Sequence, residues 1–368
     1  MVDLPTPSPH PPEPRPGRIA DPSGQTPRTN RPLARAWPNY RSSFAAIDLG
    51  TNNCRLLIAR PSHDGFIVID AFSRIVRLGE GLVSTGRISD AAIERTLAAL
   101  SICAGKLRRR HVGLARSVAT EACRRAANGP AFIDRVYNET GIALDIISAE
   151  EEARLAVLGC HILLEPGDGP ALVFDIGGGS TELVLVDSKG PVPEILDWQS
   201  VPWGVVSLTE TVPFDAEDPV ARAAGYAEMR DTVARSFDAF AKRIAPHATG
   251  MARLLGTSGT VTTLASLHLK LPAYDRSAID GLIVPSASMR AISASLSMMS
   301  PEERYALPTI GRERGQLVVA GCAILESILD IWPAERLGVA DRGIREGILR
   351  ALMATRTRGS ASGNGNPR

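Results

Sequence analysis

The chain has 368 residues, of which 44% are hydrophobic and 22% are charged, and this predicts an ordinary globular protein of about two domains. The formal net charge of +1 argues against a general nucleic-acid-binding protein, which needs a basic excess to displace the counterions of phosphate. No run of about 18 apolar residues could span a membrane, and the five cysteines form no CxxC pair, so we expect a cytoplasmic protein without structural zinc.

Both ends of the sequence have the composition of disordered tails. Residues 1–42 are rich in Pro, Arg, Ser and Thr and lack the apolar segment of a secretory signal. Residues 356–368 are rich in Gly, Ser and Asn. Such segments bury too little apolar surface to offset the entropy that is lost on ordering.

An internal repeat organises the part between these tails. Residues 44–58 align without gaps on residues 171–185, which places Asp48 on Asp175. Each copy is an apolar strand, an aspartate, a glycine-containing turn and a second apolar strand. Two such hairpins in one chain predict two related lobes that face a cleft. The predicted lobes are residues 43–168 and residues 169–355.

Between and after the hairpins, apolar periodicity predicts alternating helices and strands. Ser148 and Glu151 have the spacing of a capping box, which predicts a helix that begins at about Ala149. The chain after the second hairpin is mainly helical, with one short strand before a Gly/Ser/Thr loop. The predicted strands are 112–118, 142–147 and 253–256, and the predicted helices include 130–139, 218–245, 315–329 and 343–353.

The turn of the second hairpin is the most specific feature of the sequence. Its glycines allow backbone N–H groups to approach an anion, and the following hydroxyl side chains add donors. The flanking carboxylates of Asp175 and Glu182 suit a hard cation that bridges phosphate oxygens. The alternative is a tight hairpin that only needs positive φ angles. The predicted phosphate-binding residues here are Gly177, Gly178, Gly179, Ser180 and Thr181.

Two further loops have a similar composition. The turn of the first hairpin repeats the aspartate and the glycine, and its predicted phosphate-binding residues are Asp48, Gly50, Thr51, Asn52 and Asn53. A third loop opens a predicted helix, whose free amides and dipole favour an anion. Its residues are Gly256, Thr257, Ser258, Gly259 and Thr260. An ordinary N-cap is the alternative for this third loop.

Two side chains are candidates for catalysis. Glu152 lies in the first turns of the helix that follows Ser148, and bound phosphates would raise its pKa, which suits a general base. Arg124 has a planar donor fork that could clamp a phosphate. The alternatives are a solvated acidic helix face for Glu152 and a surface arginine for Arg124.

In order and spacing, these motifs resemble the exopolyphosphatase/guanosine pentaphosphate phosphatase (Ppx/GppA) family of the acetate and sugar kinase, heat-shock protein and actin superfamily. The resemblance runs from about Phe44 to Leu352. It implies a two-lobed, actin-like α/β fold with a duplicated ribonuclease H-like core. Further matching motifs are Ser117 to Asn128, Ile146 to Arg154, Trp203-Gly204, Glu303-Arg304 with Pro308, and Ala340 to Gly347.

The resemblance also implies a role for each matched residue. Glu152 would be the catalytic base, Arg124 would contact phosphate, and Asp175 and Glu182 would hold or orient magnesium or another divalent or monovalent ion. The chain resembles the short form of the family, without the C-terminal helical domain that carries metal-binding histidines, and a homodimer is an expectation from the resemblance alone.

Two positions depart from the family pattern. Asn53 stands where the first loop usually has a hydroxyl residue, which alters how one phosphate would be held. Glu121 stands where a small hydroxyl residue is common, and there it would either repel a polyanion or pair with Arg124.

The predicted function is that of a magnesium-dependent exopolyphosphatase, which releases the terminal phosphate of inorganic polyphosphate. The first alternative is the removal of the 5′ phosphate of guanosine pentaphosphate to give guanosine tetraphosphate in the stringent response. The second is a regulator that senses guanosine tetraphosphate or polyphosphate without catalysis. We expect neither nucleic acid nor a membrane as a partner.

Overall fold

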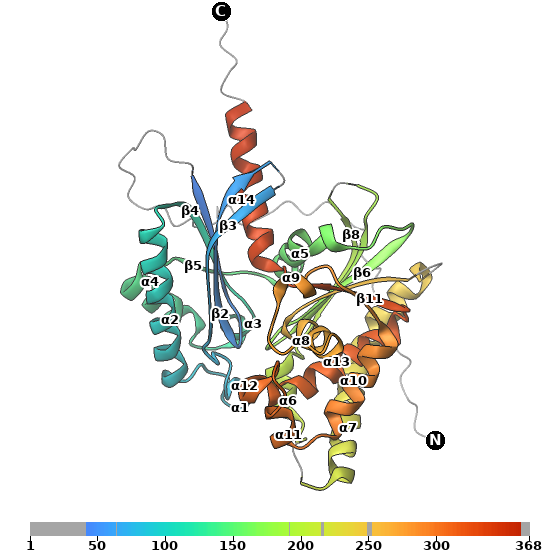
Figure 1. The fold of residues 1–368 in the computed structure, drawn as a ribbon. Coiled ribbons are helices and arrows are strands. Elements are labelled where there is room, and N and C mark those ends of the chain that lie inside the picture. The colour runs from blue at the N-terminus through green and yellow to red at the C-terminus, as the bar shows by residue number, and fades with distance from the viewer. Residues whose placement is uncertain (1–41, 64, 191, 215–216, 249–251, 362–368) are drawn as a thin grey trace, which may run out of the picture.

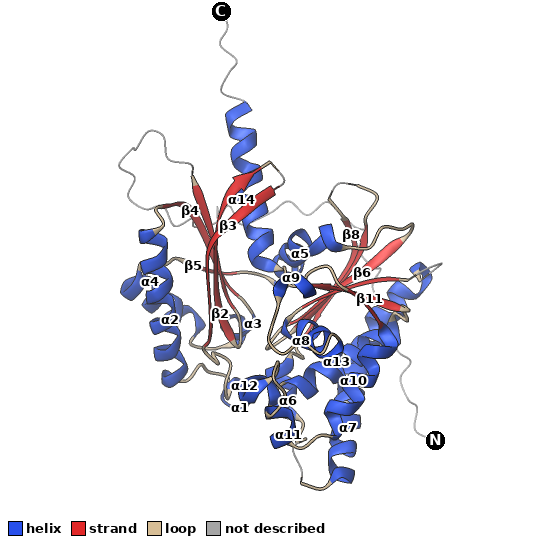
Figure 2. Ribbon diagram, in the orientation of Figure 1, coloured by secondary structure: helices blue, strands red, loops and turns tan. Residues whose placement is uncertain are grey.

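The computed structural model describes residues 42–361 except 64, 191, 215–216 and 249–251, and it describes only the backbone of 356–361. Most of both predicted tails therefore lies outside the described residues. Two β-sheets stand side by side, with helices on their outer faces and two helices between them (Figure 1, Figure 2). Within the described residues, no helix is long and apolar enough to cross a membrane.

The first sheet has the strand order β3-β2-β1-β4-β5. Its first three strands pair antiparallel, and β4 and β5 extend the sheet in parallel. The strands are β1 (Ser43–Leu49), β2 (Asn53–Ser62), β3 (Gly65–Ile75), β4 (Val112–Ala119) and β5 (Leu144–Ile146).

The second sheet has the order β10-β11-β9-β6-β7-β8, and its last five strands repeat the directions of the first sheet. Only the antiparallel edge strand β10 is extra. The strands are β6 (Pro170–Ile176), β7 (Thr181–Asp187), β8 (Glu194–Val201), β9 (Arg253–Thr257), β10 (Ile283–Pro285) and β11 (Arg336–Ala340). The predicted duplication and the actin-like α/β fold class are confirmed.

The predicted helices form, and other helices lie before and between them. In chain order the helices are α1 (Leu82–Thr85), α2 (Asp90–Arg109), α3 (Glu121–Arg125), α4 (Gly129–Thr140), α5 (Ala149–Cys160), α6 (Val205–Thr211), α7 (Pro219–Ile244), α8 (Gly259–His268), α9 (Arg276–Ile279), α10 (Ser286–Met298), α11 (Pro301–Tyr305), α12 (Gly311–Gly315), α13 (Val318–Ile331) and α14 (Ile344–Ala361). Those that were predicted are α4, α5, α7, α8, α13 and α14, and the backbone of α14 continues past residue 356, where the tail was predicted to begin.

The central strands are apolar throughout because both of their faces are buried. In β1, Ile47 and Leu49 contribute to the core under α2, whereas Phe44 and Ala46 belong to a cluster with α14. In β6 the outer core contains Phe174, and the inner face packs against α5. A continuous apolar run is typical of such doubly covered strands.

The two helices between the sheets are exchanged between the halves of the chain. Helix α5 precedes the second sheet in sequence and packs on it, while the C-terminal helix α14 packs on the first sheet. Helix α5 packs tightly against the start of α14: a Cβ added to Gly159 would lie 1.9 Å from the carbonyl oxygen of Gly343, the residue before α14. The predicted boundary at residue 168 therefore separates the two sheets but not the two packed layers.

One predicted helix cap is only half formed. Ser148 caps α5 by accepting the N–H of Glu151 at 3.2 Å. The Glu151 carboxylate does not complete a capping box, because it accepts hydrogen bonds from Arg116 and Arg154 instead.

Candidate active site

The carboxyl ends of β1 and β6 face each other across a cavity of about 440 Å³. Residues from both hairpin turns, from the start of α5 and from the start of α8 line it. The predicted site residues on its wall are Asp48, Gly50, Thr51, Asn52, Asn53, Glu152, Asp175, Gly177, Gly178, Gly179, Ser180, Glu182, Ser258, Gly259 and Thr260. Four other predicted site residues do not line the cavity: Arg124, Thr181, Gly256 and Thr257.

Each of the two hairpin turns contains the same backbone hydrogen bond. In the first turn the Gly50 N–H donates to the Asn53 carbonyl at 2.9 Å, and in the second the Gly177 N–H donates to the Ser180 carbonyl at 2.9 Å. These residues are equivalent in the sequence repeat. The structure therefore extends the predicted duplication to the geometry of the turns.

Each turn is also held from behind by the chain that follows its third strand. In the first half this support segment is residues 76–81, whose Gly79 N–H donates to the Thr51 carbonyl. In the second half it is residues 203–207, whose Val205 N–H donates to the Gly177 carbonyl. Val76 and Val206 likewise donate to the Asn52 and Gly178 carbonyls, at 2.9 and 2.8 Å.

These bonds orient the amides of both turns. A peptide group is planar and trans, so its N–H points opposite to its carbonyl. Because the carbonyls of Thr51 and Gly177 point to the support segments, the N–H groups of Asn52 and Gly178 point away from them, toward the cavity that both residues line. Consecutive amides that face one concavity form an anion-binding nest.

The glycines of the second turn are explained by contact and not by strain. None of Gly177, Gly178 and Gly179 has a positive φ, so the positive-φ hairpin offered as an alternative is not what the turn forms. A Cβ on Gly178 would lie 2.9 Å from the Cβ of Thr51, and one on Gly179 would lie 2.6 Å from its Oγ1. The turns of the two lobes touch, and only glycine fits between them.

The third loop contributes only its second half. Ser258 caps α8 by accepting the Val261 N–H at 3.2 Å, which leaves the first amides of the helix, those of Gly259 and Thr260, without intrahelical partners. Gly256 and Thr257 do not line the cavity. Both belong to β9, where a Cβ on Gly256 would meet the Phe174 ring, and the Thr257 hydroxyl donates to the Arg342 carbonyl at 2.7 Å.

The hydroxyl of Thr181 has its partner inside the protein. Thr181 is fully buried, and its hydroxyl donates to the Trp203 carbonyl at 2.6 Å. Side chains alternate along a strand, so Ser180 and Glu182 share one face of β7 and Thr181 has the other. The Thr181 hydroxyl therefore holds the second support segment in place.

The wall carries several buried carboxylates. Asp175 and Glu182 are cross-strand partners, and both have a pKa raised to about 7. Burial is the main cause for each; the charges of Glu152 and Asp48 raise the pKa of Asp175 further, and the charge of Asp175 raises that of Glu182. Hydrogen bonds to Glu182 from Ser180 and Ser200 act in the opposite direction.

Glu152 and Arg124 form an ion pair of 2.7 Å. Burial raises the pKa of Glu152 well above its ordinary value, the charge of Glu182 adds to this, and Arg124 opposes it. Arg124 lies behind the wall, and its other contacts are with the carboxylate of Glu121 and the carbonyl of Ile147. Of the two possibilities raised by the sequence for Glu121, pairing with Arg124 is confirmed.

Several wall residues were not predicted as site residues. Arg55 of β2 and Arg74 of β3 bring positive charge from the first sheet, and Glu313 and Arg314 come from α12. The repeat contained a signal for Arg55, because it aligns with Glu182 and faces Asp48 across the hairpin. No local pattern pointed to Arg314, which reaches the cavity only through the packing of the second lobe.

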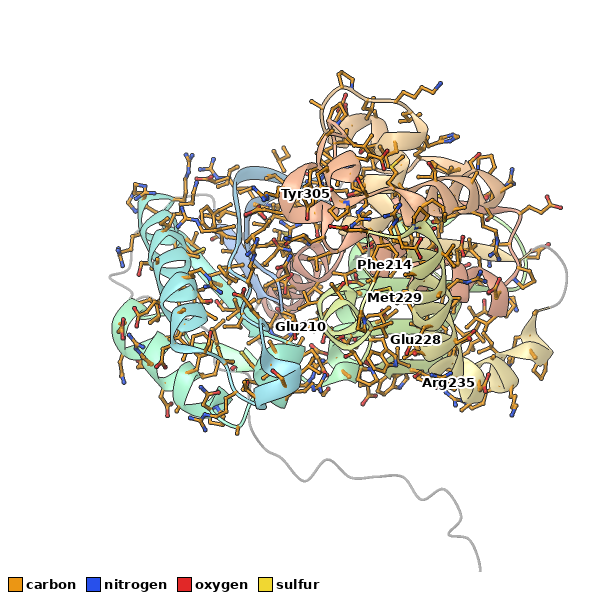
Figure 3. The ribbon with its side chains drawn as sticks, turned by 90° about the horizontal axis from the view of Figure 1, so that it is seen from below. Glu210, Phe214, Glu228, Met229, Arg235 and Tyr305 are labelled. Atoms are coloured by element: carbon orange, nitrogen blue, oxygen red, sulfur yellow. The ribbon has the colours of Figure 1, made fainter. Side chains whose placement is uncertain are left out.

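The first support segment also contacts α6, the helix in which the second support segment ends. The Gly81 N–H donates to the Glu210 carboxylate of α6 at 2.9 Å. In Figure 3, Glu210 lies where the helices of the two lobes come together. One hydrogen bond thus joins the support of the first turn to the helix that continues from the support of the second.

Comparisons with known proteins agree with this architecture. The sequence profile of the Ppx/GppA phosphatase family matches residues 57–356. The chain belongs to this family. It is 33% identical over 326 residues to Exopolyphosphatase 2 of Mycobacterium tuberculosis (strain H37Rv), with 84% of this chain and 98% of that protein aligned. To a putative exopolyphosphatase of Haemophilus influenzae it is 25% identical, over 86% of this chain and 94% of that protein.

Solved structures of family members have the same fold. The crystal structure of the Aquifex aeolicus member matches with a TM-score of 0.70 and 29% identity, over 86% of this chain and 98% of that one. An exopolyphosphatase from Cytophaga hutchinsonii matches with a TM-score of 0.76 and 25% identity, over 85% and 98%. The predicted enzyme class, a hydrolase of phosphate anhydrides, is confirmed by these relatives.

One family motif has a structural role that the sequence did not reveal. Arg304 is fully buried and donates to the carbonyls of Gly315 and Met299 at 2.9 and 2.8 Å. Its guanidinium also lies 5.3 Å from the centre of the Phe214 ring. It fixes the turn that carries Glu313 and Arg314 to the cavity.

Proposed function

We propose that this protein hydrolyses the terminal phosphate of inorganic polyphosphate. The observation that carries the proposal is the convergence of three sets of backbone amides on one cavity, beside a buried carboxylate with a raised pKa. The names of the relatives from M. tuberculosis and C. hutchinsonii support polyphosphate as the substrate. The amides of both turns and of α8 would surround the terminal phosphoryl group, and Arg55, Arg74 and Arg314 would attract the phosphates that follow it.

In this proposal Glu152 is the general base. It would accept a proton from a water molecule as the water oxygen forms a bond to the terminal phosphorus, and the anhydride P–O bond would break toward the shortened chain. Burial raises the pKa of Glu152, which makes it a stronger base for this proton. Arg124 would hold the Glu152 carboxylate in place and stabilise charge on the phosphoryl oxygens.

The carboxylates of Asp175 and Glu182 fit a magnesium ion. Their pKa values of about 7 reflect burial and repulsion from neighbouring carboxylates, which a cation would relieve. In the described part of the chain, no group of three or more acidic, histidine or cysteine side chains forms a metal cluster. Magnesium often takes only one or two carboxylates where phosphates and water complete its shell, and it neutralises negative charge there.

The test is phosphate release by the purified protein with magnesium and long polyphosphate. We expect Glu152→Gln to lower kcat by about 10²- to 10⁴-fold, because it removes the base but keeps the shape. Glu150→Gln is the matched control, since Glu150 lies in the same helical turn but is exposed. Near-normal turnover by Glu152→Gln would remove Glu152 from its role.

The same assay separates the substrates. Guanosine pentaphosphate offers the same terminal anhydride, so faster release from it would make the chain a guanosine pentaphosphate phosphohydrolase. If neither substrate releases phosphate while both bind, the protein is a sensor of these anions and not an enzyme.

A further inference from the structure

Glu121 stands between the phosphate loops and Arg124. It is the first residue of α3 and lines the cavity. Its Cγ lies 3.0 Å from the position that a Cβ of Gly179 would occupy, so its side chain rests against the second glycine turn. The Glu121 side chain is 15% exposed and that of Arg124 is 17% exposed, which leaves the pair partly shielded from water.

The guanidinium of Arg124 is almost fully engaged inside the protein. Its Nε and Nη2 donate to one carboxylate oxygen of Glu121 at 3.1 and 2.7 Å. Its Nη1 donates to the Ile147 carbonyl at 2.9 Å and to Glu152 at 2.7 Å. An arginine has five N–H donors, so one remains for a ligand.

The occupied edge is the one that an anion would need. Arginine binds phosphate most strongly through two parallel N–H groups. The Nε–Nη2 edge of Arg124 is such a pair, and Glu121 already accepts both of its hydrogen bonds. The Nη1 group cannot replace this edge, because it is bonded to the base and to a carbonyl.

We propose that Glu121 is an internal counterion that a bound phosphate must displace from the Nε–Nη2 edge of Arg124. This inference rests on the proposed role of Arg124 as a phosphate ligand. In the resting protein the Glu121 carboxylate occupies the place of the anion. When phosphate leaves, the carboxylate returns, so Glu121 weakens the hold on the released product as well as on the substrate.

The binding of inorganic phosphate tests this directly, because the product is not consumed. Titration calorimetry with magnesium present would compare wild type with Glu121→Gln and Glu121→Thr. We expect both variants to bind inorganic phosphate about 3- to 10-fold more tightly, and Thr more so because its side chain is too short to take the place of the Glu121 carboxylate on Arg124. With polyphosphate the gain should be larger in KM than in kcat.

Arg124→Ala distinguishes displacement from simple repulsion. If Glu121 acts through Arg124, the gain from Glu121→Gln disappears when Arg124 is also replaced by alanine. A gain that persists in the double variant means general repulsion and overturns the proposal, and weaker phosphate binding by Glu121→Gln overturns it too. Glu94→Gln, which breaks an exposed ion pair with Arg135, is the control and should bind phosphate like wild type.

The outcome for Glu121 is separable from the outcome for the proposed function. If phosphate binding tightens in Glu121→Gln but the protein hydrolyses no polyphosphate, the counterion role of Glu121 stands and the proposed activity is wrong. If hydrolysis depends on Glu152 but phosphate binding does not change in Glu121→Gln, the proposed activity stands and the counterion role is wrong. Thermal unfolding of each variant excludes misfolding as the cause of a change.

Discussion

The two hairpins of this protein have the same framework but different charges: the facing pair is neutral overall in the first and negative in the second. Both turns have the same backbone hydrogen bond, and both are held by a support segment that follows the third strand. Across the first hairpin, however, Asp48 faces Arg55, whereas across the second Asp175 faces Glu182. The duplicated backbone therefore supplies amides twice, while the side chains place an arginine opposite the aspartate in one lobe and a second carboxylate opposite it in the other.

The largest effect should come from the contact between the two turns. Gly178→Ala would place a Cβ 2.9 Å from that of Thr51 and push the lobes apart, whereas a Cβ at Gly50 would lie 3.7 Å from its nearest atom. We expect Gly178→Ala to lower kcat/KM by about 100-fold, since a displacement of about 1 Å can cost that much. Gly50→Ala should cause a much smaller loss.

Steady-state kinetics on both variants, with thermal unfolding as a check on folding, measure this difference. Equal losses in the two variants would mean that the turns are interchangeable and that their contact has no special role.

The charge difference between the two hairpins should appear in the pH dependence of activity. The pKa of Asp175 and of Glu182 is raised to about 7, so both take up protons as the pH falls below 7 and lose affinity for a cation. Activity should therefore fall on the acid side of pH 7. Burial raises the pKa of both Asp48 and Asp175, and the positive charge of Arg55 opposes this rise.

Replacing Arg55 removes that influence. Arg55→Met should move the acid limb of the kcat/KM profile to higher pH by roughly half a unit to one unit. Arg55→Lys keeps the charge and should restore most of the wild-type profile. An acid limb that stays in place in Arg55→Met would show that Arg55 does not act on the carboxylates.

The sequence predicted the duplicated framework well because the repeat has no gaps. The ungapped alignment matched Asp48 with Asp175 from the sequence alone. That Asp175 lies opposite Glu182 is shown only by the strand pairing. Thr181 has the opposite strand parity to Glu182 and lies on the other face of β7. Thr257 lies off the wall because β9 extends through it and the loop begins only at Ser258.

Other features depend on packing that no local pattern contains. The exchange of α5 and α14 between the sheets could not be read from their apolar faces, because such a face does not specify which sheet it covers. Arg314 reaches the cavity from a distant helix for the same reason. The pairing of Glu121 with Arg124 was one of two possibilities, and only the fold decided between them.

A smaller effect, on KM, is expected at the hydrogen bond between Gly81 and α6. Glu210→Ala removes the acceptor for the Gly81 N–H and should raise KM about two- to fivefold, because one hydrogen bond to a charged group is lost at an exposed site. Glu210→Gln keeps an acceptor and should recover much of the loss. If Glu210→Ala changes only the melting temperature and not KM, the bond stabilises the fold without aligning the loops.

The smallest effect is expected on the free energy of unfolding. In each half of the chain, an aspartate of the third strand pairs with the helix that covers the sheet. Asp70 of β3 accepts hydrogen bonds from Lys106 and Arg110 at 2.7 and 2.8 Å, and Asp197 of β8 pairs with Arg243 at 2.7 Å. The Asp70 side chain is 14% exposed and that of Asp197 is 27% exposed. Asp70→Asn should therefore cost about 1 kcal/mol of unfolding free energy at pH 7, and Asp197→Asn about half of this or less.

The pH dependence identifies the source of the Asp70 contribution. The hydrogen bonds from Lys106 and Arg110 lower the pKa of Asp70 from 3.8 to about 2. A lowered pKa in the folded state means that the stabilisation is fully present above about pH 4 and is lost as the pH falls toward 2. Urea unfolding of wild type and Asp70→Asn from pH 7 to pH 2 should show a difference that shrinks only below pH 4. A difference that stays constant to pH 2 would mean that packing, and not the ion pair, ties β3 to its helix.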